Sequence, residues 1–153
     1  MSALPSLSKL LGINTSTLSI KEHVLLEAGL FVCICEELKQ IFSEEYKEYF
    51  RLLNFTTEKE NLMLESTLTQ LIIKDILSTE EYNLKGIAYY TDTFEEVVEE
   101  FAIGSNASPS AIFLRKLINL HMSVRRELYS FIMKKIIANT EDAGLDLEIS
   151  SVA

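Results

Sequence analysis

Apolar residues recur at steps of three and four along most of this chain, which is the pattern of amphipathic helices. The longest such run extends from Ser108 to Lys135. Ser108 suits the N-cap, because its hydroxyl can accept from an otherwise unpaired backbone N–H, and Pro109 then takes the first helical position, where no N–H is needed. The apolar stripe consists of Phe113, Leu117, Leu120, Val124, Leu128 and Phe131. We therefore predict one long last helix that packs this stripe into the core.

A second apolar pattern runs from Ile20 to Leu53 and is too long for one ordinary globular helix. We predict two helices that meet near Ser43 with little or no loop, because the sequence SEEY places carboxylates in the first turn of a new helix. Thr57 and Glu60 then form a capping box, which predicts the start of a third helix.

The start signal recurs at Ser78 and Glu81, which predicts a fourth helical element. Gly86 interrupts this element, and Asp92 can cap the following run FEEVVEEFAI. Gly104 is a good residue to end that run, since glycine tolerates the left-handed conformation after a helix. No segment shows the alternation of a strand, so the predicted class is all-α.

The helical patterns lie within residues 19–139, and we predict one folded domain there. Residues 1–18 contain many serines and threonines, and we interpret them as a loosely ordered arm with one short turn at Leu7–Leu11. Residues 140–153 lack helical periodicity and are predicted to form a flexible tail.

The composition of the chain limits the classes of partner that such a domain can bind. The formal net charge of −9 repels phosphate backbones and anionic headgroups, so nucleic acids and membrane surfaces are poor partners. The apolar run Val24–Cys35 is too short to span a bilayer, and no signal peptide is evident, so we expect a cytoplasmic protein. Cys33 and Cys35 point to different faces of a helix and are expected to be buried, reduced thiols. A protein or a small molecule is the expected partner.

The two histidines, His23 and His121, are candidates for metal or catalytic chemistry. His23 lies one turn before Glu27, but a di-iron bundle needs Glu-x-x-His pairs, which neither His23 nor His121 provides. Arg115 and His121 match the loose Arg-to-His spacing of the HEPN helical ribonucleases, although Lys116 replaces the family's usual short polar residue. A HEPN-like ribonuclease is therefore an alternative function, and the acidic charge disfavours its RNA substrate.

A basic pair offers a third possibility, because His121 lies at the edge of the apolar stripe and Arg125 follows one turn later. Either His121 is a hydrogen-bonded histidine at the core boundary, or the pair binds an anionic head group such as a ligand carboxylate. Glu27 is an alternative internal counter-charge. The acidic run Glu95–Glu100 is expected to be a solvated face or a docking surface for a basic partner.

The segment from Ile103 to Ile132 resembles the last-helix signature of haem-less globin sensor domains, which include stressosome RsbR-type proteins and stand-alone sporulation-inhibitory sensor-domain proteins. The shared pattern is a small-residue loop, a capped start and a leucine stripe that reaches an arginine and an aromatic residue. The residues that match it are Leu117, Leu120, Arg125 and Tyr129. The similarity covers about thirty residues, and the rest of the chain matches in helix order and length.

This resemblance implies a globin-like fold of five to six helices and a homodimer through the last two long helices. Apolar residues off the main stripe also favour such an interface; they are Ile112, Ile118, Met122, Tyr129 and Ile136. Haem is not implied, because Thr79–Tyr90 contains no proximal histidine.

The implied function is a non-enzymatic sensor domain, and stand-alone relatives suggest a decoy that inhibits a sporulation sensor kinase by titrating its signal. The implied ligands are a fatty acid in an apolar tunnel and a buried halide. The residues predicted to contact the fatty acid are Phe31, Cys35, Leu68, Phe94, Leu117, His121, Arg125 and Phe131. A helical interaction module without a ligand is a further alternative.

Overall fold

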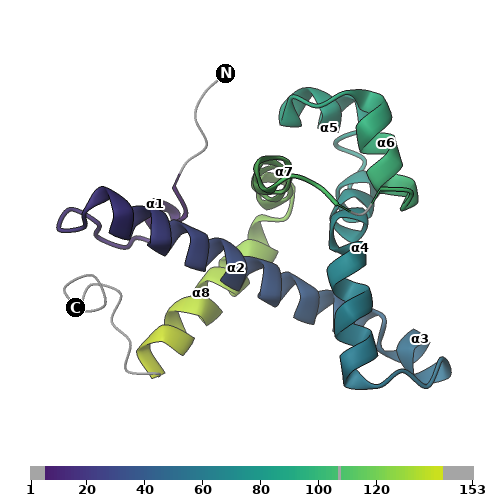
Figure 1. Cartoon of the computed structure of the whole chain (residues 1–153), viewed down its shortest axis with the longest axis horizontal. Coiled ribbons are helices and arrows are strands. Elements are labelled where there is room, and N and C mark those ends of the chain that lie inside the picture. Colours follow the sequence, from purple (N-terminus) through teal and green to yellow (C-terminus); the bar gives the residue numbers. More distant parts are fainter. Residues whose placement is uncertain (1–5, 107, 143–153) are drawn as a thin grey trace. The chain divides into compact units, whose positions relative to one another are not determined.

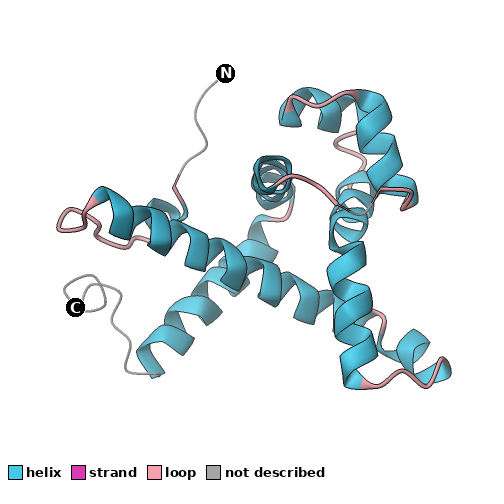
Figure 2. Ribbon diagram, in the orientation of Figure 1, coloured by secondary structure: helices cyan, strands magenta, loops and turns pink. Residues whose placement is uncertain are grey.

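The computed structural model describes residues 6–106 and 108–142, and these residues form eight helices connected by short loops (Figure 1). The described residues contain no strand, so the all-α prediction is confirmed (Figure 2). The helices are α1 (Leu7–Leu10), α2 (Ile20–Glu45), α3 (Lys47–Leu52), α4 (Thr57–Ser78), α5 (Leu84–Thr91), α6 (Glu95–Ile103), α7 (Ala111–Val124) and α8 (Arg126–Asp142). A globin-like arrangement of these helices stays a prediction.

The described chain divides into two compact units. The terminal unit combines the N-terminal residues up to Glu37 with the residues from Glu127 onward, and the central unit comprises residues 38–126. Helix α2 continues from the terminal unit into the central unit, and the chain returns to the terminal unit at the start of α8.

In the terminal unit, Glu27 attaches the N-terminal segment to α2. The Glu27 carboxylate accepts from the backbone N–H groups of Leu7, at 2.7 Å, and Ser8, at 2.8 Å, which are unpaired donors in the first turn of α1. Burial raises the pKa of Glu27, but these hydrogen bonds from Ser8 and Leu7 outweigh it, so the pKa lies below its usual value. The short turn predicted at Leu7–Leu11 is confirmed as α1, and the segment predicted to be a loose arm makes these contacts. The predicted tail lies outside the described residues from position 143 onward, and α8 extends to Asp142.

Helices α2 and α8 are joined within the terminal unit by an ion pair between Lys135 Nζ and Glu37 Oε1, 3.0 Å apart. The buried apolar side chains of this unit include Leu30, Ile34, Tyr129, Ile132 and Ile136.

The core of the central unit is formed by α4 to α7. Helix α4 packs against α6 and α7, and α5 packs against the same two helices. On α4 the buried stripe comprises Leu64, Leu68, Ile72 and Ile76, and on α7 it comprises Phe113, Leu117, Ile118 and Leu120. The rings of Phe101 on α6 and Phe113 on α7 lie with their centroids 4.8 Å apart, which joins these two helices.

Several helix boundaries differ from the predicted ones. Helices α2 and α3 meet at Tyr46 instead of Ser43, although the prediction of two helices with almost no loop is confirmed. Helix α4 is capped by Thr56, whose hydroxyl accepts from the Lys59 N–H, and not by Thr57. Thr56 has extended backbone angles while Thr57 is already helical, and only the former geometry lets a side chain cap.

The predicted start at Ser78 is wrong, because α4 continues to Ser78 and the next helix is capped by Asn83, whose side chain accepts from the Gly86 N–H. Asp92 is also not an N-cap: it ends α5 in the left-handed conformation, with φ of 55°. Aspartate tolerates this conformation better than most residues. Gly104 ends α6 with φ of 83°, as predicted.

The predicted long helix from Ser108 to Lys135 is two helices. Its first cap is Ser110, whose hydroxyl accepts from the Phe113 N–H, and not Ser108. At Arg125 the backbone leaves the helical region, with φ of −127° and ψ of 56°, and α8 begins at Arg126. This break shifts the apolar stripe by one residue, so Tyr129 is buried while the stripe residue Phe131 is 59% exposed.

Candidate functional site

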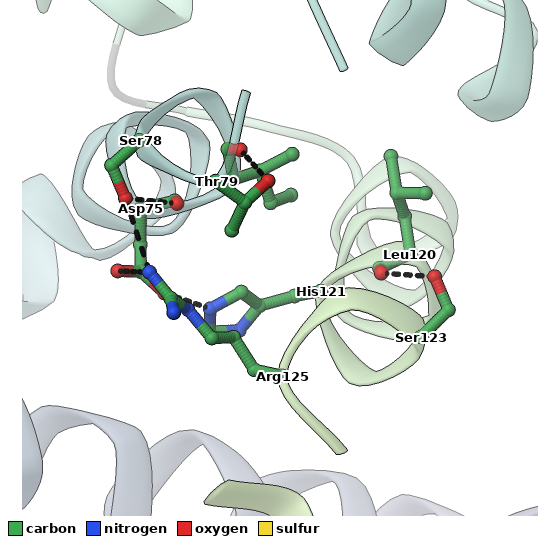
Figure 3. Close-up of polar contacts among 8 residues, drawn as sticks. Asp75, Ser78, Thr79, Leu120, His121, Ser123 and Arg125 are labelled. Atoms are coloured by element: carbon green, nitrogen blue, oxygen red, sulfur yellow. Dashed lines mark hydrogen bonds and ion pairs between the residues drawn. The ribbon is translucent and has the colours of Figure 1, made fainter. Parts of the chain in front are cut away.

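The main polar cluster of the central unit is centred on the carboxylate of Asp75, which lies on α4. His121 Nε2, from α7, is 2.6 Å from Asp75 Oδ2. Arg125 donates through Nε to the same oxygen at 3.0 Å and through Nη2 to Oδ1 at 3.1 Å (Figure 3). Arg125 Nη2 also donates to Ser78 Oγ at 3.1 Å. We call these four residues, Asp75, Ser78, His121 and Arg125, the carboxylate clamp.

Helical spacing explains why these residues meet. His121 and Arg125 are four positions apart, so both side chains emerge on one face of α7. Asp75 and Ser78 are three apart on α4, which packs against α7. The Arg125 N–H donates to the His121 carbonyl oxygen at 2.9 Å, which is the last hydrogen bond of α7. The clamp therefore lies at the point where α7 ends.

The electrostatics of the clamp favour an ionised carboxylate. The pKa of Asp75 falls from the usual 3.8 to about 2. The main cause is the hydrogen bond from His121, and the hydrogen bonds from Arg125 add to it, whereas burial opposes the decrease. The same contact with Asp75 raises the pKa of Arg125. An ionised carboxylate only accepts hydrogen bonds, so His121 Nε2 is the donor in the pair. The side chain of His121 is fully buried, whereas Asp75 is 24% exposed and Arg125 is 38% exposed.

Asp75 is not among the site residues predicted from the sequence, which include Glu27 as an alternative internal counter-charge. Asp75 is the counter-charge, and Glu27 binds the start of α1. The available signal was the position of Asp75 within the run LIIKDIL, next to the buried Ile76. A carboxylate beside a core position needs a partner, because an unpaired charge there would be strongly destabilising.

The residues predicted to contact the fatty acid are divided between the two units and differ in burial. Within the central unit, Leu68 and Leu117 are buried, and His121 and Arg125 meet in the clamp. Phe94, just before α6, is 78% exposed and does not line an interior wall. The other three lie in the terminal unit, where Phe31 and Cys35 are half-buried and Phe131 is exposed.

Arg115 and His121, the pair that would serve a HEPN-like ribonuclease, both lie on α7. His121 is buried with Nε2 against Asp75, and Arg115 is half-buried. The ribonuclease alternative stays a prediction. Within residues 6–106 and 108–142, no group of three histidine, cysteine or acidic side chains is arranged to hold a metal ion. No helix in the described part of the chain has both the length and the apolar character needed to cross a bilayer.

The homodimer was predicted from apolar residues off the main stripe, and most of these are covered within the chain. Ile118, Tyr129 and Ile136 are buried, whereas Ile112 is 69% exposed. The reason for placing an interface on the last two helices is therefore largely removed, and dimerisation itself stays a prediction.

Comparison with known proteins found no similarity that could assign a function. The chain matches no protein-family model, no curated protein and no solved structure.

Proposed function

We propose that this chain is a non-enzymatic sensor domain that binds a fatty-acid-like ligand without haem. The observation that carries the proposal is the carboxylate clamp, in which His121 and Arg125 together provide three hydrogen bonds to one carboxylate. A donor set that holds the Asp75 carboxylate has the chemistry to hold the carboxylate of a fatty acid.

Such a ligand would also need apolar contacts for its alkyl chain close to the clamp. Ile72 and Ile76 on α4 and Leu117 on α7 are fully buried aliphatic side chains on two helices that pack together. Burying each methylene of an alkyl chain contributes roughly 0.8 kcal/mol. A chain of about ten carbons could therefore bind with few other polar contacts, after the entropy cost of association.

The ligand would have to compete with Asp75 for the same donors. Asp75 is 24% exposed, so its carboxylate can turn toward solvent when another carboxylate replaces it. Arg125 is the residue at which α7 ends, so this exchange would act on the backbone that connects α7 to α8. Ligand binding would thereby change a defined junction of the chain, as a sensor requires.

The family resemblance suggests that the domain inhibits a sporulation kinase by titrating its signal.

The ligand-free interaction module is the competing proposal, and under it the clamp serves only to fix the end of α7. Both proposals include the carboxylate clamp. They differ on whether a ligand carboxylate can displace the Asp75 carboxylate from His121 and Arg125.

Isothermal titration calorimetry with sodium decanoate distinguishes the two proposals. Removal of the competing charge in Asp75→Asn should tighten decanoate binding about tenfold, and Arg125→Ala should weaken it by at least as much, because a charge-assisted hydrogen bond contributes roughly 1.5–3 kcal/mol. Glu65→Gln is the matched control, since it makes the same carboxylate-to-amide change on α4, at a side chain that is 61% exposed and pairs with Lys39. Absence of saturable binding to Asp75→Asn, together with no lipid released from denatured protein, would leave only the interaction module.

A further inference from the structure

Helix α1 lies beside the N-terminal half of α2, which completes the first turn of α1 (Figure 1). The backbone N–H groups of Leu7 and Ser8 donate to the Glu27 carboxylate at 2.7 and 2.8 Å. The next N–H group, that of Lys9, donates to the hydroxyl of the N-cap Ser6 at 3.2 Å. A helix of four residues is not stable by itself, so α1 depends on its contacts with the terminal unit.

The segment 6–18 is otherwise closed by its own hydrogen bonds. The Ile13 N–H donates to the Ser8 carbonyl oxygen at 2.8 Å, across the end of α1. Gly12, with φ of 74°, provides the left-handed residue that this kind of helix end requires. Glu27 accepts both of the backbone hydrogen bonds that join this segment to the rest of the described chain. The segment is therefore a separate unit that is attached to α2 at one carboxylate.

Two leucines anchor the segment beside that carboxylate. Leu7 and Leu11 are buried, whereas Leu10 between them is 41% exposed. On α2, Glu27 shares a helix face with the buried Leu30, three positions later. The terminal unit thus combines a carboxylate with an adjoining apolar surface, and α1 occupies both.

The connection from α1 to α2 has the properties of a tether. Residues 12–19 contain no helix, and most of them are exposed. A short flexible connection gives the tethered segment an effective concentration on the order of millimolar. A segment that is docked in most molecules must then bind, as a free peptide, with a Kd of roughly 100 micromolar or below.

We propose that α1 is an autoinhibitory occupant of a docking site for the start of a partner protein's helix. The site consists of the Glu27 carboxylate and the adjoining apolar face of α2. The partner that fits it is a helical segment with a serine-like N-cap, free N–H groups in its first turn, and leucines at its first and fifth positions. An anion is stabilised at a helix N-terminus, and hydrogen bonds to a charged acceptor are stronger than neutral ones. This site lies in the terminal unit and does not depend on the function proposed for the clamp.

Fluorescence anisotropy with a labelled synthetic peptide of residues 1–18 tests the site on the full chain. In the double variant Leu7→Asp, Leu11→Asp, which we call the undocked chain, the peptide should bind saturably at roughly 100 micromolar or below. The wild type should bind it at least about tenfold more weakly, because the tethered segment occupies the site. Adding Glu27→Gln to the undocked chain should weaken binding about tenfold or more. Adding Glu44→Gln instead, at an exposed position further along α2, should leave binding unchanged.

Variants of the peptide test the chemistry of the occupant. The peptide with Lys9→Ala and Leu10→Ala changes only exposed positions and should bind the undocked chain as tightly as the original peptide. The peptide with Leu7→Ala and Leu11→Ala should bind about tenfold more weakly or less, because it loses apolar surface that is buried in the docked segment. Equal binding of the two variant peptides would overturn the proposed recognition.

A cleavable chain guards against misfolding of the undocked chain. A protease site inserted between the exposed residues Ser16 and Thr17 leaves the sequences of α1 and α2 unchanged. After cleavage, the labelled peptide should exchange with the N-terminal fragment while the far-UV circular dichroism spectrum is retained. A fragment that does not exchange would show that α1 is a permanent part of the core. That result, or equal binding of the peptide to the wild type and the undocked chain, would overturn the proposal.

Discussion

The replacement Asp75→Asn should destabilise the fold through the loss of the clamp. The substitution keeps the size of the side chain but removes the charge that holds Arg125 at two nitrogens and that accepts from the buried His121. Arg125 is 38% exposed and can turn to water, whereas His121 is fully buried and would lose a charged acceptor. Loss of a hydrogen-bond partner by a buried group costs about 1–3 kcal/mol.

The pKa of Asp75 gives an independent magnitude and a direction with pH. A decrease from 3.8 to about 2 corresponds to roughly 2 kcal/mol, at about 1.4 kcal/mol for each tenfold change in proton affinity. Solvent screening of the partly exposed carboxylate reduces this contribution to about 1–2 kcal/mol. Because the pKa is lower in the folded state, the contribution is complete above pH 4 and is lost as the pH falls from about 4 to about 2.

Urea unfolding followed by circular dichroism at a series of pH values measures both effects. At pH 7, Asp75→Asn should lower the free energy of unfolding by about 1–3 kcal/mol, while the control Glu65→Gln on the same helix should change it by less than about 0.5 kcal/mol. Below pH 4 the gap between wild type and Asp75→Asn should narrow. If wild type and Asp75→Asn have the same free energy of unfolding at pH 7, or if their difference stays constant down to pH 2.5, Asp75 does not stabilise the fold as an ionised carboxylate.

Two further predictions concern α7. Leu117→Ala should lower the free energy of unfolding by about 2–5 kcal/mol, because Leu117 is fully buried, and a loss below about 0.5 kcal/mol in chemical denaturation would contradict the assigned core face. Ser110→Ala should cost about 1 kcal/mol through the lost cap, whereas Ser108→Ala should be nearly neutral; equal losses for the two variants would show that the helix start is misplaced.

Periodicity was sufficient to predict the all-α class and most of the core stripes, because burial of one face follows directly from spacing. Phe113, Leu117 and Leu120 are buried as predicted. Helix starts were less predictable, since several residues near each start could act as caps. Ser108 and Ser110 both can accept a hydrogen bond, and only the backbone angles of the folded chain decide which of them does.

The break at Arg125 could not be predicted from local sequence. Neither proline nor glycine lies there, and arginine favours helices. Arg125 instead leaves the helix while its side chain binds Asp75, fifty residues earlier in the chain. The spacing of apolar residues along a helix does not indicate an ion pair with a residue so far away in the sequence. The same break explains why the stripe prediction succeeds at Leu117 and fails at Phe131, which lies beyond it.

The most direct measurement of the clamp and its proposed role is a carbon-13 NMR titration of the Asp75 carboxyl, with and without decanoate. Without ligand, the Asp75 signal should remain that of an ionised carboxylate down to about pH 3, as a pKa of about 2 requires. At pH 7, where decanoate is ionised, saturating ligand should shift the Asp75 carboxyl signal, because the ligand has replaced Asp75 at His121 and Arg125. A carboxyl that titrates near 3.8 in the free protein would contradict the clamp, and a signal that decanoate leaves unchanged at pH 7 would contradict its exchange with a ligand.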